Sequence, residues 1–128
     1  MGNREKTDGF EQLEIWQKAI DLAVIIYRLT DKFPKSEVYS LTNQMRRASS
    51  SVSANIAEGY GRHNFKEKLQ FYKIANGSLL ETKSFCYLSN RLGYISTNQL
   101  NDTTSSIITI QKMTNALIQS VRSNNEIN

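Results

Sequence analysis

The chain has 128 residues, 39% of them hydrophobic, and a formal net charge of +4. This length suits one domain with a sizeable core, and the hydrophobic content excludes a wholly disordered chain. One proline and six glycines are too few for a β-sandwich or barrel with many tight turns, and a single cysteine, Cys86, excludes an internal disulfide or a cysteine-rich zinc site.

The N-terminal residues give no targeting signal. The first ten, MGNREKTDGF, are polar and charged and lack the apolar centre of a signal peptide. The longest apolar stretch, residues 22–27, is far shorter than the ~20 residues that a membrane span requires. We therefore expect a cytoplasmic protein that does not cross a membrane.

The spacing of apolar residues predicts a first helix from about Glu11 to Asp31. On a helical wheel its apolar residues cover an arc of roughly 220°, much wider than the ~100° of one buried face. A small bundle buries only one side of such a helix. The second side then needs another partner, and a further copy of the chain is the simplest one.

A second helix is expected between the break at Phe33-Pro34 and about Glu58, with Ser36 as its N-cap. Residues at steps of three and four predict its core stripe: Leu41, Met45, Ala48, Val52, Ile56 and Gly59. Gly59 and Gly61 are expected to end this helix, one of them in the left-handed C′ conformation.

Two more helices follow. Asn64 with Glu67, and Ser96 with Gln99, predict capping boxes at the starts of the third and fourth helices, and Gly93 predicts the end of the third after about Leu92. Four helices with short connections predict an all-α, antiparallel, up-down-up-down four-helix bundle. We expect one domain over residues 10–122, with flexible ends at 1–9 and 123–128.

The segment Ser53–Arg62, SANIAEGYGR, places an amide and a carboxylate among apolar residues near a helix end. Half-buried polar groups need partners. For Glu58 the candidates are Arg62 or an arginine of a neighbouring chain. For Asn55 they are backbone groups at the glycine break or a bond across to Asn76. We interpret Asn55, Glu58 and Gly59 as a structural motif that fixes the corner between the second and third helices.

Several motifs occur in an order typical of one known family: FEQLEIWQKA, QMRRA at 44–48, SANIAEG at 53–59, GS at 77–78 and LGYI at 92–95. The chain resembles, over about residues 10–122, the bacterial four-helix-bundle proteins named for intervening sequences of 23S rRNA genes. It departs from the commonest pattern at Ser49–Ser51 and His63. The resemblance implies that the chain assembles into a ring-shaped homo-oligomer of five subunits. It also implies a relation to the accessory protein of diversity-generating retroelements, a basic pentamer thought to bind nucleic acid and a reverse transcriptase.

No catalytic, cofactor or metal site is expected, so we predict a protein that is not an enzyme. The single histidine, His63, falls in an exposed corner, and Cys86 falls on a core-facing position far from it. The Glu-x-x-His pairs of bundle di-metal sites are absent from the sequence, and GYGR lacks the lysine of a phosphate-binding loop.

Basic residues gather in one segment. Between positions 43 and 73, six bases against two acids give +4, the net charge of the whole chain. One hypothesis is a homo-oligomer that binds RNA or DNA phosphates through this surface, with Tyr60 and His63 stacking on unpaired bases. The alternative is a scaffolding oligomer that docks another protein and has no nucleic-acid role. The candidate phosphate contacts are Arg46, Arg47, Arg62, Lys66, Lys68 and Lys73.

Overall fold

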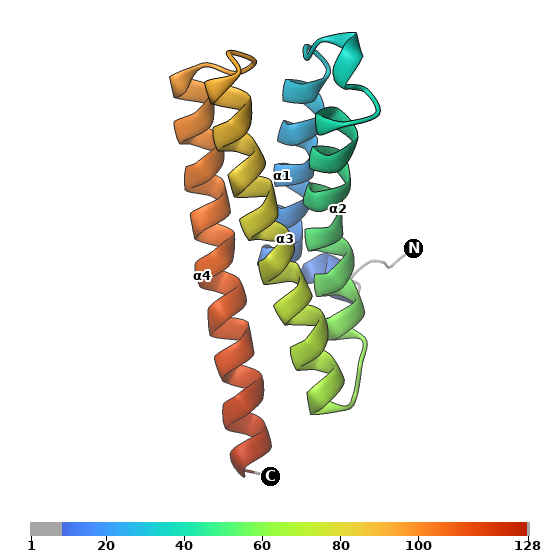
Figure 1. Cartoon of the computed structure of the whole chain (residues 1–128). Coiled ribbons are helices and arrows are strands. Elements are labelled where there is room, and N and C mark those ends of the chain that lie inside the picture. The colour runs from blue at the N-terminus through green and yellow to red at the C-terminus, as the bar shows by residue number, and fades with distance from the viewer. Residues whose placement is uncertain (1–8, 128) are drawn as a thin grey trace, which may run out of the picture.

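The computed structural model describes residues 9–127, which form four α-helices and two short 3-10 turns (Figure 1). The α-helices are α1 (Glu14–Thr30), α2 (Leu41–Tyr60), α3 (Phe65–Arg91) and α4 (Thr97–Ile127), and the turns are η1 (Phe10–Gln12) and η2 (Lys35–Glu37). The all-α class predicted from the sequence is therefore confirmed for this part of the chain.

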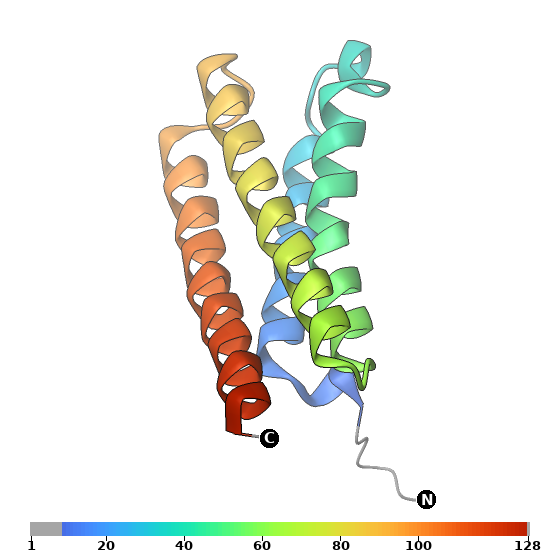
Figure 2. The same ribbon diagram turned by 60° about the horizontal axis from the view of Figure 1, so that its bottom comes forward.

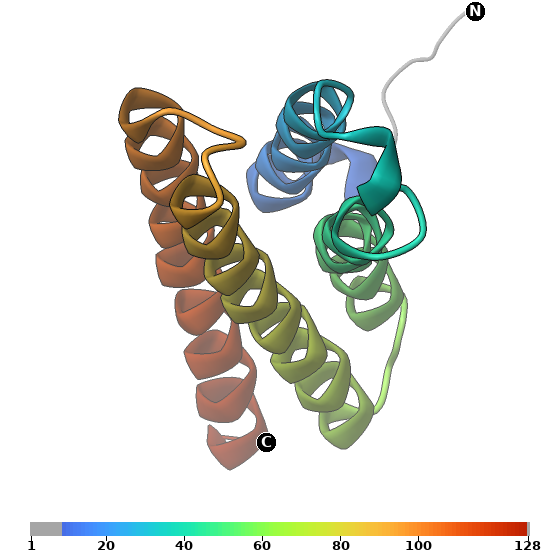
Figure 3. The same cartoon turned by 45° about the horizontal axis from the view of Figure 1, so that its top comes forward.

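The helices run alternately up and down, so helices that follow one another in sequence lie side by side (Figures 1 and 2). The most extensive contact joins α2 and α3, and the least extensive helix–helix contact joins α1 and α4. In Figure 3, where the top of the bundle comes forward, the pair α3–α4 lies at an angle to the pair α1–α2. This arrangement agrees with the predicted up-down bundle.

The bundle core has the side chains that helical spacing predicts. All six positions of the predicted α2 stripe are buried, and Met45, Val52 and Ile56 are fully buried. They pack with the inner faces of α1, α3 and α4 in one large cluster, while Tyr72, Ile118 and Val121 form a smaller cluster between α3 and α4.

Two predicted helix starts are wrong by several residues. The chain enters α1 at Glu14, because residues 10–12 form η1 and Phe10 packs on Trp16 with ring centroids 5.1 Å apart. Ser36 is not the N-cap of α2. It lies inside η2, and α2 begins at Leu41 after Ser40. Ser36 in the polar turn η2 and Ser40 before α2 are both residue types that often cap helices. The sequence pattern therefore placed the start of α2 one turn too early.

The helix ends also differ in part from the predictions. Neither Gly59 nor Gly61 is left-handed: Gly59 lies inside α2, Gly61 has φ −78°, and Gly93 is the one described residue with positive φ, at 81°. Gly93 ends α3 in a Schellman motif, in which its N–H donates to the carbonyl of Asn90 and the next N–H to that of Ser89. The end of α4 lies five residues beyond the expected position 122, because the helix continues to Ile127.

The helix caps follow the sequence more closely. Ser96 and Gln99 form both bonds of the capping box before α4, at 3.1 and 2.8 Å. Asn64 accepts from the N–H of Glu67 at 3.1 Å, but the Glu67 carboxylate lies 3.8 Å from Arg62. Among the described residues, Glu67 makes no return bond to Asn64.

Candidate nucleic-acid interface

Asn55 bonds within its own helix rather than across the bundle. Its amide nitrogen donates to the Ser51 carbonyl at 2.8 Å and to the Ser51 hydroxyl at 2.9 Å, one turn earlier in α2. Ser78 of α3 donates to the same Ser51 hydroxyl at 3.0 Å. Both partners expected from the sequence, the glycine break and Asn76, are therefore wrong. Asn76 instead donates to Asn115 of α4 at 2.8 Å.

Glu58 pairs with Arg62 at 2.8 Å, the first of its two candidate partners. The guanidinium of Arg62 also lies 3.8 Å from Glu67 and 5.0 Å from the ring centroid of Phe71. Glu58 and Glu67 are the two acids of the basic segment, and both lie within ion-pair distance of Arg62. All of these charges are exposed, so each pair adds little to stability.

Gly59 lets α3 approach α2 closely. A Cβ at this position would lie 2.5 Å from the Tyr72 ring, closer than packed atoms allow. Tyr72 is buried, and burial together with the nearby Tyr60 raises its pKa to about 12. The glycine of the motif is therefore required by packing, and the helix backbone continues through it.

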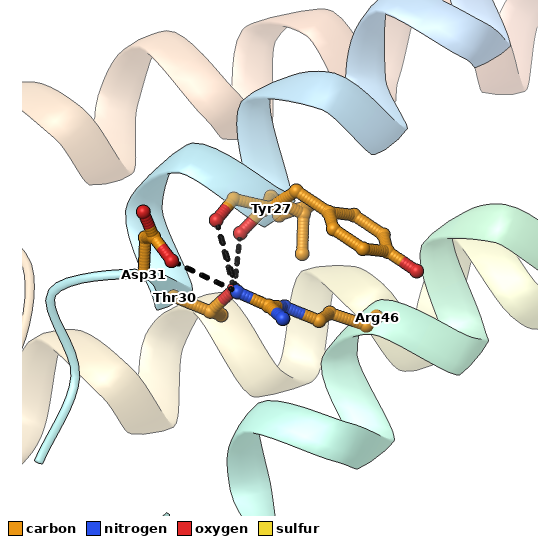
Figure 4. A network of polar contacts seen from close by, with 5 residues as sticks. Tyr27, Thr30, Asp31 and Arg46 are labelled. Atoms are coloured by element: carbon orange, nitrogen blue, oxygen red, sulfur yellow. Dashed lines mark hydrogen bonds and ion pairs between the residues drawn. The ribbon is translucent and has the colours of Figure 1, made fainter. Parts of the chain in front are cut away.

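Arg46 of α2 caps the C-terminal end of α1 (Figure 4). Its Nε donates to the Thr30 hydroxyl at 2.9 Å and its Nη2 to the Tyr27 carbonyl at 3.3 Å, while Asp31 lies 3.6 Å away. The guanidinium also stacks over the Tyr27 ring, 4.6 Å from its centroid. The side chain is only 29% exposed. It holds two helices together and presents little of its charge to solvent.

Lys68 of α3 does the same for the end of α2. Its ammonium donates to the carbonyls of Gly59 and Tyr60 in the last turn, each at 3.0 Å, and the Gly59 carbonyl also accepts from the N–H of Arg62 at 3.2 Å. Partial burial lowers the pKa of Lys68. Two bases that the sequence offered as phosphate contacts thus serve as helix caps. The sequence carries a signal for this role only at α1, whose end has no glycine, because Gly59 and Gly61 predicted a left-handed end for α2.

The other basic side chains face solvent. Arg47, Lys66 and Lys73 are exposed and make no hydrogen bond or ion pair with any residue that the structure describes. His63 is exposed in the α2–α3 corner, and Tyr60 is partly exposed beside it. Three of the six candidate bases therefore bond within the chain and three remain available to a ligand. The first group is Arg46, Arg62 and Lys68, and the second is Arg47, Lys66 and Lys73.

A groove that sequence reasoning missed lies between α2 and α3. Its volume is about 630 Å³, with Arg47 on the α2 side and Glu81 on the α3 side. No single-helix pattern predicts it, because small residues of two helices form it together. Its other lining residues are Gln44, Ala48, Ser50, Ser51, Ala54 and Ser78.

Cys86 is fully buried in the main core, and burial raises its pKa to about 11, so the thiol stays protonated at neutral pH. Across residues 9–127, no group of three or more histidine, cysteine or acidic side chains is arranged to hold a metal ion. None of the helices in that range has the length and apolar character of a membrane span.

Comparison with known proteins places this geometry in a family. Residues 11–116 match the family described as 23S rRNA-intervening sequence protein. No curated protein sequence matches the chain. Among solved structures, a protein of unknown function from the S23 ribosomal protein family of Bacteroides thetaiotaomicron shares the fold, with a TM-score of 0.73 and 22% identity over 81% of this chain and 97% of the other. The chain belongs to the 23S rRNA-intervening sequence protein family.

Proposed function

We propose that this protein is a non-enzymatic homo-oligomer of four-helix bundles that binds RNA or DNA through basic side chains of α2 and α3. The proposal is supported by which charged side chains of that segment are paired within the chain and which are not. Arg47, Lys66 and Lys73 are exposed and lack an acidic partner among the described residues, whereas Arg62 pairs with both nearby acids. An excess of positive charge therefore stays available to a polyanion.

The expected contacts are to phosphates rather than to bases. Lysine ammonium groups on an exposed helix face act as point charges and do not read a sequence. The rings of Tyr60 and His63, at the corner that ends α2, add a stacking surface for unpaired bases. Assembly multiplies a small charge per subunit by the number of copies, so that weak sites act together.

The resemblance noted above supports the remaining parts of the proposal. A pentameric ring and a relation to the accessory protein of diversity-generating retroelements rest on it, whereas the proposed cytoplasmic location rests on the short apolar stretches of the sequence. Exposed apolar side chains on α1, Val24 and Tyr27, add support for assembly, because one bundle leaves them in water.

The test is binding of a structured RNA and a matched DNA duplex, measured by fluorescence anisotropy across a salt series. The double variant Lys66→Glu/Lys73→Glu should bind at least about tenfold more weakly, with a salt dependence shallower by about two ions. The control Lys35→Glu/Lys112→Glu makes the same change in net charge at exposed positions outside this surface and should bind like wild type. Equal losses in both variants, or no binding by wild type at low salt, would overturn the proposal.

A protein-docking oligomer is the second candidate, and a specific observation favours it. The outer face of α3 exposes three large apolar side chains, Leu80, Tyr87 and Leu88, and Leu80 is 57% exposed. Such side chains are typical of protein interfaces rather than of phosphate-binding surfaces. This function predicts no nucleic-acid binding, and capture of a protein partner that persists at high salt and is lost in Leu80→Asp/Tyr87→Asp.

A further inference from the structure

The outer side of α1 carries an apolar surface that the chain itself does not cover. Val24 is 40% and Tyr27 46% exposed, and both line a shallow hollow with Ile20 and Ala23. Apolar side chains gathered on one helix face mark a contact surface more often than isolated ones do. A partner is therefore expected on this side of α1.

A base borders this surface. Arg28 lines the hollow, is exposed and makes no ion pair with a described residue. Asp21 is also exposed, but it lies on the side of α1 that faces α4, where it lines a separate hollow with Ser106 and Thr109. The α1 surface therefore consists of an apolar ridge with a base beside it.

The α2–α3 groove has the complementary features. It carries Arg47 on one wall and Glu81 on the other, and neither side chain is paired among the described residues. Ala48, Ser51, Ala54 and Ser78 line it with small side chains, and small side chains let a neighbouring helix come close.

Gly77 adds an independent observation. It lies in the middle of α3, one turn before Glu81, and is exposed. A Cβ at Gly77 would meet nothing within 4 Å, and its backbone is not in the left-handed region, so the chain itself gives no reason for a glycine there. Glycine within a helix costs stability. A second backbone that approaches α3 beside the groove would explain it.

We propose that α1 of one copy of this chain packs into the α2–α3 groove of a second copy, with Arg28 facing Glu81. The inference rests on the homo-oligomer of the proposed function and identifies its interface. The two surfaces are different, so each copy offers one to each neighbour, and such a head-to-tail contact closes into a ring when the rotation allows. Arg47 then belongs to the subunit contact, and Lys66 and Lys73 are left for phosphates.

The first test is the size of the protein in sedimentation velocity, with circular dichroism as a check of folding. Ala54 is exposed and lines the groove, so Ala54→Arg should fill it and raise the dissociation constant of the assembly at least about tenfold. The matched control is Ser105→Arg, at an exposed position of α4, and it should assemble like wild type.

The second test exchanges the two charges of the proposed pair. Arg28→Glu and Glu81→Arg should each weaken assembly, and the double variant should recover it, because the ion pair is restored in reverse. If Ala54→Arg unfolds, as judged by the loss of its helical circular dichroism, this charge exchange still tests the interface.

Each outcome has one meaning. Dissociation of Ala54→Arg, or recovery in the charge exchange, supports the interface. If wild type and Ala54→Arg assemble equally well and the two charge changes show no coupling, the proposed interface is wrong. The homo-oligomer itself is then still supported. A wild type that is monomeric at all concentrations overturns the oligomer and the interface together. Nucleic-acid binding does not enter this test.

Discussion

Gly59 and Tyr72 determine how closely α2 and α3 can approach each other. The ring of Tyr72 occupies the space in which any other residue at 59 would place its Cβ. Gly59→Ala should therefore force the two helices apart and lower the free energy of unfolding by about 1–3 kcal/mol, the usual cost of overpacking a core. Urea unfolding followed by circular dichroism measures this change.

Gly61 supplies the control for this prediction. A Cβ there would lie 3.7 Å from its nearest neighbours, which is ordinary contact, and its φ of −78° suits alanine. Gly61→Ala should leave stability unchanged or raise it by about 0.4–1 kcal/mol, because it restricts the unfolded chain. If the two alanine variants were equally stable, the close approach at Gly59 would not be the reason for that glycine.

Single residues also show where sequence reasoning reaches its limit. Met45, Val52 and Ile56 were placed correctly in the core, because spacing fixes which side of a helix faces inward. Arg46 and Arg47 looked equivalent in the sequence, yet one caps α1 and the other faces solvent. Successive residues of a helix point about 100° apart, so neighbouring charges can have different roles. Which of the two arginines caps α1 depends on where the end of α1 lies in space. The spacing of residues within α2 gives no information on that position.

At the level of elements, the ends of α1 and α2 are both closed by a cation from the next helix. Arg46 reaches the end of α1 and Lys68 the end of α2, whereas α3 ends in its own glycine motif. Backbone carbonyls in the last turn of a helix lack partners within that helix. Here the carbonyls of Tyr27 and Gly59 accept a backbone N–H just past the helix end, and a base from the following helix adds a further bond that fixes how the two helices pack.

Arg46→Ala tests this coupling of α1 to α2. It removes hydrogen bonds to the Thr30 hydroxyl and the Tyr27 carbonyl from a side chain that is 29% exposed, and the loss should lower the free energy of unfolding by about 1–2 kcal/mol. The ion pair with Asp31 contributes little, because that carboxylate is 83% exposed. Chemical unfolding measures the change.

Arg122→Ala is the comparison for this prediction. Arg122 is exposed on α4 and makes no hydrogen bond or ion pair with a described residue. Its replacement should change stability by less than about 0.5 kcal/mol. An Arg46→Ala protein as stable as Arg122→Ala would show that the bonds in Figure 4 do not hold α1 against α2 in solution.

Element boundaries were predicted less well than the elements themselves. The capping box before α4 was found because both of its bonds are local in sequence. The start of α2 was missed because it depends on η2, where Glu37 accepts from Ser40 nearby and from Tyr94 far along the chain. The α2–α3 groove was missed for the same reason, since no pattern within one helix describes a surface that two helices share.

On the scale of the whole molecule, a contact between the two connecting loops joins the pairs α1–α2 and α3–α4 at one end of the bundle, the top in Figure 1. Tyr94 follows α3, and its hydroxyl donates to the Glu37 carboxylate at 2.8 Å, while Ser40 donates to the other oxygen at 2.6 Å. The Tyr94 ring also packs on Phe33, with centroids 5.0 Å apart. The extensive α2–α3 contact is the main connection between the two pairs, and this loop contact adds a second link at the end of the bundle where the connecting loops lie.

The same contact makes stability depend on acidity. Hydrogen bonds from Ser40 and Tyr94 lower the pKa of Glu37 below its usual 4.5. The stabilisation is therefore fully present above that value and is lost as the pH falls through the lower pKa of the folded state. Glu37→Gln keeps a hydrogen-bond acceptor but cannot titrate, so its free energy of unfolding should fall less steeply than that of wild type on acidification.

Urea unfolding at several pH values from about 7 to about 3 measures the difference, over the range in which carboxylates titrate. Asp102→Asn removes an exposed carboxylate on α4 that has no hydrogen bond or ion pair with the described residues, and its curve should stay parallel to that of wild type. Tyr94→Phe removes one of the two donors and should flatten the acid limb only in part, because the bond from Ser40, the larger cause of the lowered pKa of Glu37, remains. If the curves of wild type and both loop variants were parallel, the ionisation of Glu37 would not contribute to holding this end of the bundle together.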